Sequence, residues 1–581
     1  MGKQRFPNYY NLQMKHSQMQ IGLIIFKAVG LLLEQCFFLI LIMFIVAGCK
    51  QQEPIKTPTA SSLPSLYITL PPKALDSILH DRDCEVHAEA LLLSVENDTM
   101  YDGELTHIQT RGNTTFIFDK KSFTIKFPQK IRLLGLDRNR SFVLLANPCD
   151  ESHIRNAMAL DLARAFGIPA SRYAYLRLYL NGEYSGLYQI TNKVEVGRNT
   201  LNIIDLNKLN RQSNPRPLDD YTWFAYGRKK QTVLRKGVLL EQNPEDITGG
   251  YLLDNSGTNE LYCRSVSGFV SAAGDPIRIR SPKYASPEEV EYIAELYDQM
   301  EAAVLASDGC NPETGKHYSD YIDVGSFARY YLLNEIFLNF DGGWTSFMMY
   351  KDSDYIDPKI YAGPAWDFDR TLGNPRFQKG VKLYNRLVVN GKRGIDGEPH
   401  SGGLLYHLMQ HDDFVAVVKY YYEQEIGPIC HNYVEAGYWD SIAENLHAEA
   451  DKDNLLYGTR FSVDYDEAVS NTIDFLRQRI AFFDWFYSTE ESERVKVTVF
   501  LSDNKKTDVY YPLGKPIYTP QAELRTNHDP VYELCYADTD SIVKDGTIFN
   551  EAQNLELHKR DPNWHEVQMR RVRKKLKKYF Y

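Results

Sequence analysis

The sequence predicts an α+β fold with a β-rich region first, a helical region next and a small β module last. Residues 66–130 alternate between apolar and polar side chains, with Asn- and Gly-containing turns between the runs, as half-buried strands do. From Pro287 onward, apolar residues recur at helical spacing. We therefore place the β-rich region at about 66–285, the helical region at about 286–487 and the β module at 493–581.

The composition is that of a globular protein long enough for two or three domains. Of the 581 residues, 43% are hydrophobic and 24% are charged, which excludes a largely disordered chain. The formal net charge of −10 argues against a nucleic-acid partner. The chain has forty tyrosines and six tryptophans. Because a tyrosine ring is apolar and its hydroxyl needs a partner, this excess favours carbohydrate contacts or large interfaces.

Residues 1–49 are predicted to be a lipoprotein signal peptide. Basic residues precede an apolar run, 36–47, and Cys49 follows Ile-Val-Ala-Gly, which is similar to the lipobox of bacterial lipoproteins. A transmembrane anchor over 21–46 is the alternative, although Lys27 within it costs about 2.5 kcal/mol or more. Residues 50–65 are rich in Pro, Thr and Ser and predict a flexible tether. We expect an exported lipoprotein, anchored through Cys49 at the outer membrane or cell surface.

The remaining cysteines do not indicate a metal or redox site. Once Cys49 carries lipid and Cys36 is removed with the signal, six cysteines remain, and no two of them lie within four residues of each other. This spacing excludes a zinc ribbon or a CxxC motif. Export permits disulfides, but six cysteines in so long a chain do not make a disulfide scaffold.

The early strands contain two candidate phosphate-binding lysines. The predicted strands are 85–95, 104–111 and 122–127. Alternation places Lys121 on the face of Phe123 and Ile125, and Lys126 on the opposite face. A lysine at the edge of a buried strand face suits a phosphate-binding region, but exposed strands often carry one as well. Both interpretations stay open.

A β-hairpin is predicted where Asn181-Gly182 separates two apolar runs, because this dipeptide favours a tight two-residue turn. Residues 205–235 are polar, contain two prolines and predict an insertion or a hinge loop. The strands predicted around these turns are 174–180, 185–191, 238–242 and 249–254.

Helices are predicted wherever apolar residues recur every three to four positions. They cover 151–166, 288–305, 324–339, 404–409, 414–425 and 465–487. The C-terminal module has predicted strands at 495–501, 509–513 and 530–536. Its basic end, 569–581, indicates either a helix that contacts an anionic surface or a solvated tail.

Two acidic clusters lie within residues 340–374. Asp341 stands in a Gly-Gly turn before an apolar run, and Asp367 and Asp369 follow a second apolar run. Carboxylates two positions apart share a face if the segment is extended, so Asp367 and Asp369 can share a hard cation. The alternative is that these residues simply form turns, in which aspartate is common.

Several segments resemble successive blocks of the CotH family, whose members are similar to a minimal, atypical protein kinase first associated with spore coats. The resemblance covers about 66–487. The segments that carry it are RGNTTFIFDKKSFTIKF (111–127), HIRNAMALDLARAFGIP (153–169), LYLNGEYSGLYQIT (178–191), GDPIRIRSP (274–282), FDGGWTSFMMYK (340–351) and AGPAWDFDRTLGN (362–374). The resemblance implies a two-lobed, kinase-like fold with a β-rich N-lobe and a helical C-lobe.

The resemblance also implies roles for the acidic residues. Asp341 would be the catalytic carboxylate that orients the acceptor hydroxyl and takes its proton. Asp367 would hold Mg²⁺ or Mn²⁺ on the phosphates of ATP, with Asp369 as a second ligand or as support for the loop. Lys121 would contact the phosphates, with Lys126 as the competing choice. The substrate would be a Ser or Thr of a surface or exported protein.

The chain departs from the kinase pattern at three places. Position 346, where kinases have a metal-binding Asn, is Ser. Asn192 occupies the expected place of a Glu that would pair with the lysine, and Glu195 is the nearest substitute. No standard glycine-rich phosphate loop is present, so a cradle would have to come from elsewhere, such as Arg111 and Asn113.

These observations support three hypotheses. The first is a membrane-tethered, CotH-type protein kinase. The second is a noncatalytic surface protein that keeps the kinase-like scaffold and binds glycan or protein partners. The third is glycoside hydrolysis by a pair of carboxylates.

Overall fold

The computed structural model describes residues 63–559 apart from 113, 199, 230–231, 258, 344, 375–382, 389–402, 458–463, 503–504, 518–531, 540–542 and 545. The predicted signal peptide with Cys49, most of the tether, Asn113 and the basic C-terminal end therefore lie outside the described residues. Among the helices that are described, none is long and apolar enough to cross a membrane. The predicted α+β class is confirmed.

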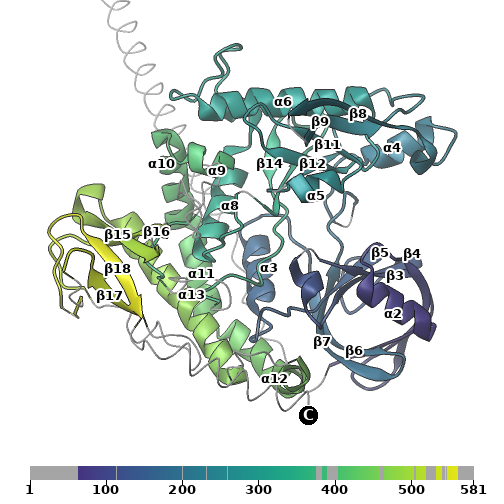
Figure 1. Ribbon diagram of the computed structural model, residues 1–581, viewed down its shortest axis with the longest axis horizontal. Helices are drawn as coiled ribbons and strands as arrows, with labels where there is room; N and C mark the ends of the chain where they lie inside the picture. Colours follow the sequence, from purple (N-terminus) through teal and green to yellow (C-terminus); the bar gives the residue numbers. More distant parts are fainter. Residues whose placement is uncertain are drawn as a thin grey trace, which may run out of the picture. The chain divides into compact units, whose positions relative to one another are not determined.

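The first strands close into a seven-stranded barrel in the order β1-β2-β3-β4-β5-β7-β6, coloured purple and blue in Figure 1. Its strands are β1 (Ser65–Thr69), β2 (Val86–Leu93), β3 (Thr99–Arg111), β4 (Ser122–Ile131), β5 (Asn139–Leu145), β6 (Tyr173–Leu180) and β7 (Glu183–Asn192). β1 and β6 pair in parallel and thereby complete the barrel. As predicted, Phe123, Ile125 and Phe127 of β4 are buried in the barrel core. Closure leaves the barrel with no unpaired edge.

The predicted hairpin is confirmed. β6 and β7 pair in antiparallel fashion around Asn181 and Gly182, whose φ angles are 49° and 84°. A two-residue turn of this kind needs positive φ at both positions, which Gly adopts freely and Asn tolerates.

The helix predicted at 151–166 is shorter, because α3 covers only Arg155–Ala165. A turn organised by Asp150 replaces its first residues. One carboxylate oxygen of Asp150 accepts a hydrogen bond from the Ser152 backbone, and the other accepts one from the Arg155 backbone. His153 has a φ of 56°, which ends any helical continuation toward the N-terminus.

A second sheet follows the barrel, with the strand order β14-β13-β10-β12-β11-β9-β8. Its strands are β8 (Trp223–Lys229), β9 (Thr232–Val238), β10 (Tyr251–Asn255), β11 (Ser267–Val270), β12 (Pro276–Ser281), β13 (Phe347–Lys351) and β14 (Ile360–Ala362). The prediction of a loop at 205–235 is wrong, because this region holds α4 (Leu206–Ser213), β8 and part of β9. β8 is an edge strand in which Trp223, Ala225 and Tyr226 are exposed, so it lacks the buried face that marks most strands.

The predicted helices are present. Those described are α2 (Pro72–His80), α3, α4, α5 (Asn259–Cys263), α6 (Pro287–Leu305), α7 (Tyr318–Tyr321), α8 (Val324–Ile336), α9 (Gly403–Leu408), α10 (Asp412–Tyr421), α11 (Gly427–Glu435), α12 (Tyr438–Tyr457) and α13 (Tyr465–Ser488). A capping box between Ser286 and Glu289 begins α6. Six of these helices, α2, α4, α5, α7, α11 and α12, were not predicted.

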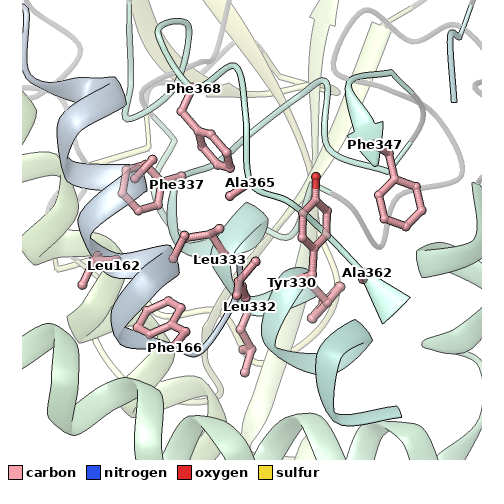
Figure 2. Packing of buried hydrophobic residues seen from close by; sticks show 14 of the residues in the cluster. Leu162, Phe166, Tyr330, Leu332, Leu333, Phe337, Phe347, Ala362, Ala365 and Phe368 are labelled. Atoms are coloured by element: carbon pink, nitrogen blue, oxygen red, sulfur yellow. The ribbon is translucent and has the colours of Figure 1, made fainter. Parts of the chain in front are cut away.

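The large core joins α3, α8, β13 and β14. Figure 2 shows Leu162 of α3 and Phe166, which follows that helix, close to Leu333 of α8 and Phe337, which follows α8. Phe368, which lies between the two predicted metal ligands, is fully buried, and its ring packs edge-on against Phe337 with the centroids 5.5 Å apart. The core therefore holds the segment that carries Asp367 and Asp369.

The C-terminal β module is a four-stranded sheet in the order β16-β15-β18-β17. Its strands are β15 (Arg494–Ser502), β16 (Lys505–Pro512), β17 (Tyr532–Tyr536) and β18 (Asn554–Lys559), of which β18 was not predicted. Leu383 belongs to its hydrophobic core, and Phe486 of α13 packs against Tyr510. The six described cysteines are free thiols.

Candidate active site

A cleft of about 560 Å³ brings together residues that are far apart in the sequence. The barrel contributes Arg111, which ends β3. The second sheet contributes Asp254 of β10 together with residues of β12. The loop that follows α8 contributes Asp341, and the loop that follows β14 contributes Asp367 and Asp369. Four of the predicted site residues, Arg111 and the three aspartates, thus line one cleft.

Asp341 is positioned by the turn at the end of α8. Its backbone NH donates to Oδ1 of Asn339 at 3.1 Å, and the Asn339 amide donates to Oδ1 of Asn334 within α8 at 2.8 Å. Nη1 of Arg370 lies 3.9 Å from Oδ2 of Asp341. The carboxylate is partly exposed to the cleft.

Asp367 and Asp369 do not lie on an extended strand. Asp367 has a φ of 74°, in the left-handed region, and its backbone neighbour Phe368 donates its NH to Oδ1 of Asn156 at 2.8 Å. Asp367 is exposed, whereas Asp369 is buried. Oγ of Ser346 donates to Oδ2 of Asp367 at 2.9 Å. The two carboxylates are therefore presented by a turn that is anchored in the core, and not by alternation along an extended strand.

Asp369 is a buried carboxylate whose negative charge is only partly offset. Only 7% of the residue is exposed, and within the described residues no donor or cation bonds its carboxylate. Burial raises the pKa of Asp369 to about 8, and the negative charges of Asp367 and Asp150 add to this increase, while Arg370 opposes it. An excess of buried negative charge is an environment that a cation stabilises.

The carboxylates fit a magnesium-like ion. Mg²⁺ and Mn²⁺ prefer oxygen ligands, and in phosphoryl-transfer sites Mg²⁺ takes only one or two carboxylates, with substrate phosphates and water completing its shell. In the described part of the chain, no group of three or more His, Cys, Asp or Glu side chains is arranged to hold a metal. A pair such as Asp367 and Asp369 therefore fits an ion that arrives with phosphates, and it does not fit a structural metal.

Cations line the wall of the cleft. Arg278 and Arg280 alternate with buried Ile277 and Ile279 along β12, so both guanidinium groups lie on one face. Both pair with Asp254. Lys193, which follows β7, lies on the same wall.

The wall carries more positive charge than its carboxylates balance. Burial lowers the pKa of Arg111 to about 10, and Arg280 adds to the decrease. Burial also lowers the pKa of Lys193, Glu195 opposes this shift, and Arg280 and Arg111 reinforce it. The Arg111 guanidinium lies over the Trp366 ring, 4.9 Å from its centroid. Crowded cations of this kind suit an anion with several charges, such as a polyphosphate.

The family of the chain follows from a comparison with family models. The model of the CotH kinase protein family matches residues 108–483, well over half of the chain. The chain belongs to the CotH kinase family. The match runs from the end of β3 to α13 and contains every residue of the cleft named above. In a comparison with curated protein sequences, no match was found.

The two lysines chosen from the CotH resemblance lie outside this cleft. Nζ of Lys121 donates to the carbonyl of Phe116 at 2.6 Å and lies over that residue's ring. Lys126 lies on the same face of β4 as Thr124 but lines a neighbouring groove. Their phosphate-binding role stays a prediction. Lys193, Arg278 and Arg280 were not predicted, although the last two lie in the segment GDPIRIRSP, where Arg and Ile alternate.

The departures from the kinase pattern also have defined places. Ser346 bonds Asp367, so it supports a predicted metal ligand from the position where a kinase has Asn. Asn192 is buried, and its amide donates to the carbonyl of Asp137 at 2.8 Å. Glu195 acts electrostatically on Lys193. A lysine and a glutamate that influence each other electrostatically therefore lie within one short segment of this CotH protein.

Proposed function

We propose that this CotH protein transfers the γ-phosphoryl group of ATP to a Ser or Thr hydroxyl of another protein, with the help of a divalent metal. The observation that carries the proposal is the cleft, in which the three aspartates face a wall of cations. Phosphoryl transfer depends mainly on positioning and on charge neutralisation. Cations and a metal serve the nucleotide, and a carboxylate serves the acceptor.

Asp341 is the proposed base. It orients the acceptor hydroxyl and takes its proton as the hydroxyl oxygen bonds to the γ-phosphorus. The bond between that phosphorus and the bridging oxygen breaks, and ADP leaves with the electron pair. The ion pair with Arg370 holds the Asp341 carboxylate during this step, and the hydrogen bond to Asn339 holds the Asp341 backbone.

Asp367 and Asp369 are the proposed ligands of Mg²⁺ or Mn²⁺, which would neutralise charge on the phosphates. Ser346 orients Asp367 through its hydrogen bond. The buried Phe368 ring packs against Phe337 and thereby anchors the turn that carries both carboxylates. Lys193 and Arg111 would bind phosphate oxygens from the opposite wall, where their pKa values, lowered by burial, rise again next to an anion.

In this proposal the barrel acts as the N-lobe of a kinase-like fold and the helical region acts as its C-lobe. We also propose that the protein is exported and anchored through a lipidated Cys49, and that its substrate is a surface or exported protein. Because nucleotide is scarce outside the cytoplasm, such a kinase uses exported ATP or acts before it is exported.

A labelling experiment tests the function. The full chain is incubated with ATP labelled in the γ-phosphate, a Ser-containing protein mixture and Mg²⁺ or Mn²⁺. We expect transfer that stops when the metal is chelated, and that falls by at least about a thousandfold in Asp341→Asn and Asp367→Asn. Asp102→Asn, in an exposed part of β3 away from the cleft, is the matched control and keeps full activity.

Labelling that survives both cleft substitutions would remove the site assignment. Labelling that is absent from the wild-type protein, together with no nucleotide-induced rise in Tm, would favour the noncatalytic alternative. In that alternative the chain keeps the kinase-like scaffold and binds glycan or protein.

A further inference from the structure

A second hollow, with a volume of about 900 Å³, adjoins the candidate active site. Eleven of its lining residues are Lys or Arg, and only two are acidic. This concentration contrasts with the net charge of −10 for the whole chain. We call it the basic groove and define it by six of its residues, Lys126, Lys130, Arg140, Arg198, Arg211 and Lys283.

The six defining cations of the basic groove lack carboxylate partners among the described residues, although Arg140 donates to the carbonyl of Phe127 and Lys283 lies over the ring of Tyr284. All of them but the half-buried Lys126 are exposed. Within the described residues, the two acidic residues of the lining do not form ion pairs with the six defining cations. Asp205 caps α4 by accepting from the Lys208 backbone, and Glu195 acts on Lys193. The positive charge of the groove is therefore available to an external anion.

The groove is continuous with the cleft. Lys193, Arg278 and Arg280 line both hollows. One side of the groove comes from the barrel through β4 and β5, and the other comes from α4 and β12. Its volume is larger than that of the cleft, and an extended peptide advances about 3.3 Å per residue. A polypeptide in the groove can therefore bring a neighbouring hydroxyl into the cleft.

We propose that the basic groove binds an acidic, Asp/Glu-rich segment of the protein substrate next to the Ser or Thr that is phosphorylated. The identification of the groove's ligand as part of a substrate rests on the function proposed above. Carboxylates on an extended segment form charge-assisted hydrogen bonds with the Lys and Arg side chains. Complementary charge of this kind sets specificity and speeds association. The nucleotide does not need the groove, because the wall of the cleft already provides cations for its phosphates.

The test measures binding without catalysis. A fluorescent Ser-containing peptide with a run of Asp and Glu is titrated with the full chain in the absence of ATP, and anisotropy is recorded. The comparison peptide has Asn and Gln in place of the acids. We expect the acidic peptide to bind at least about tenfold more tightly, and its binding to weaken as salt is raised.

The variant Arg140→Glu/Arg211→Glu reverses one charge on each side of the groove. We expect it to weaken binding of the acidic peptide by at least about a hundredfold, since two attractive contacts become repulsive. Lys73→Glu/Arg228→Glu changes the net charge equally at exposed positions that do not line the groove, and it is expected to bind like the wild-type protein. Asp341→Asn is also expected to bind the peptide normally.

The outcomes separate this proposal from the kinase function. Loss of peptide binding in the groove variant alone supports the groove even if no phosphate transfer is found. Equal binding by the groove and control variants overturns the proposal. It is also overturned if the groove variant abolishes the Tm rise that ATP induces, because the groove then belongs to the nucleotide. Binding of a single-stranded oligonucleotide or an anionic glycan, but not of the acidic peptide, overturns it as well.

Discussion

Two regions of this CotH kinase family member bury aspartates, and they differ in how the charge is balanced. In the cleft, no donor or cation among the described residues bonds the carboxylate of the buried Asp369. Between the barrel and α12, Asp453 is buried as deeply, but Nζ of Lys120 lies 2.7 Å from its Oδ1. We call the second region the buried ion cluster; it also contains His153, whose Nε2 lies 3.6 Å from Oδ2 of Asp453.

The buried ion cluster joins two parts of the fold. Lys120 also donates to the carbonyl of Leu187 at 2.6 Å, and the NH of Leu187 donates to Asp453 at 2.8 Å. The Lys120 ammonium group and the Asp453 carboxylate therefore pair with each other, and together they also bond the backbone carbonyl and NH of Leu187 in β7. Burial alone therefore does not mark a functional carboxylate. A compensated carboxylate holds elements together, and one whose charge is only partly offset is suited to bind a cation.

Breaking the buried ion cluster should have the largest effect on stability. Lys120→Met leaves Asp453 buried without its cation, and we expect the free energy of unfolding to fall by about 3–5 kcal/mol. Denaturant unfolding followed by tryptophan fluorescence measures the change. The neighbouring Lys121→Met is the control, because that ammonium contacts only a carbonyl and a ring and is partly exposed. A loss below about 1 kcal/mol for Lys120→Met would contradict the joining role.

Substitution of the buried Asp369 in the cleft should change the free energy of unfolding in the opposite direction. In the presence of a chelator, Asp369→Asn removes a penalised charge and is expected to raise the free energy of unfolding by about 1 kcal/mol, at the expense of function. The rise in Tm caused by Mg²⁺ with ATP should disappear in the variant. Asp453→Asn, which removes a compensated charge, should destabilise the protein. If both substitutions destabilise it equally, the contrast between the two regions is wrong.

The buried ion cluster should also make stability depend on pH. Burial lowers the pKa of His153, Asp453 opposes the shift, and Lys120 adds to it. The folded state therefore binds fewer protons than the unfolded chain. The contribution of His153 to the free energy of unfolding is complete above its ordinary pKa of 6.5. It is lost as the pH falls from there toward the lower pKa of the folded state, by at most about 1.4 kcal/mol per pH unit.

His153→Asn measures this dependence, because Asn tolerates the φ of 56° at this position and does not titrate. Unfolding midpoints at pH 7.5 and 5.5 should differ less in the variant than in the wild-type protein. Identical differences in the two proteins would show that His153 does not titrate on unfolding.

The smallest expected effect concerns Ser346. Ser346→Gly removes the hydrogen bond to Asp367 without strain at a φ of 51°, and phosphate transfer should fall by about fivefold, which corresponds to about 1 kcal/mol. Ser346→Asn keeps a side-chain donor and should retain more activity. Initial rates of phosphate transfer at saturating metal compare the two. If both variants are as active as the wild-type protein, Ser346 does not position Asp367.

Much of the fold was predictable because the signals are local. The alternation in β4 predicted which side chains enter the barrel core, and Asn181-Gly182 predicted the hairpin. The edge strand β8 was missed because it has no buried, alternating face of its own. The shortened α3 was missed because the hydrogen bonds of Asp150 outweigh the helical periodicity of the residues that follow it.

The α+β class, about half of the described helices and strands, and the three aspartates that line the cleft could be predicted from the sequence. Only the tertiary structure decided which cations face them, placing Lys193, Arg278 and Arg280 on the wall while Lys121 contacts Phe116. It also decided that the charge of Asp369 is only partly offset while Asp453 is paired. The physical reason is that periodicity acts between neighbours in the chain, whereas the balance of buried charge depends on distances between residues that only folding brings together.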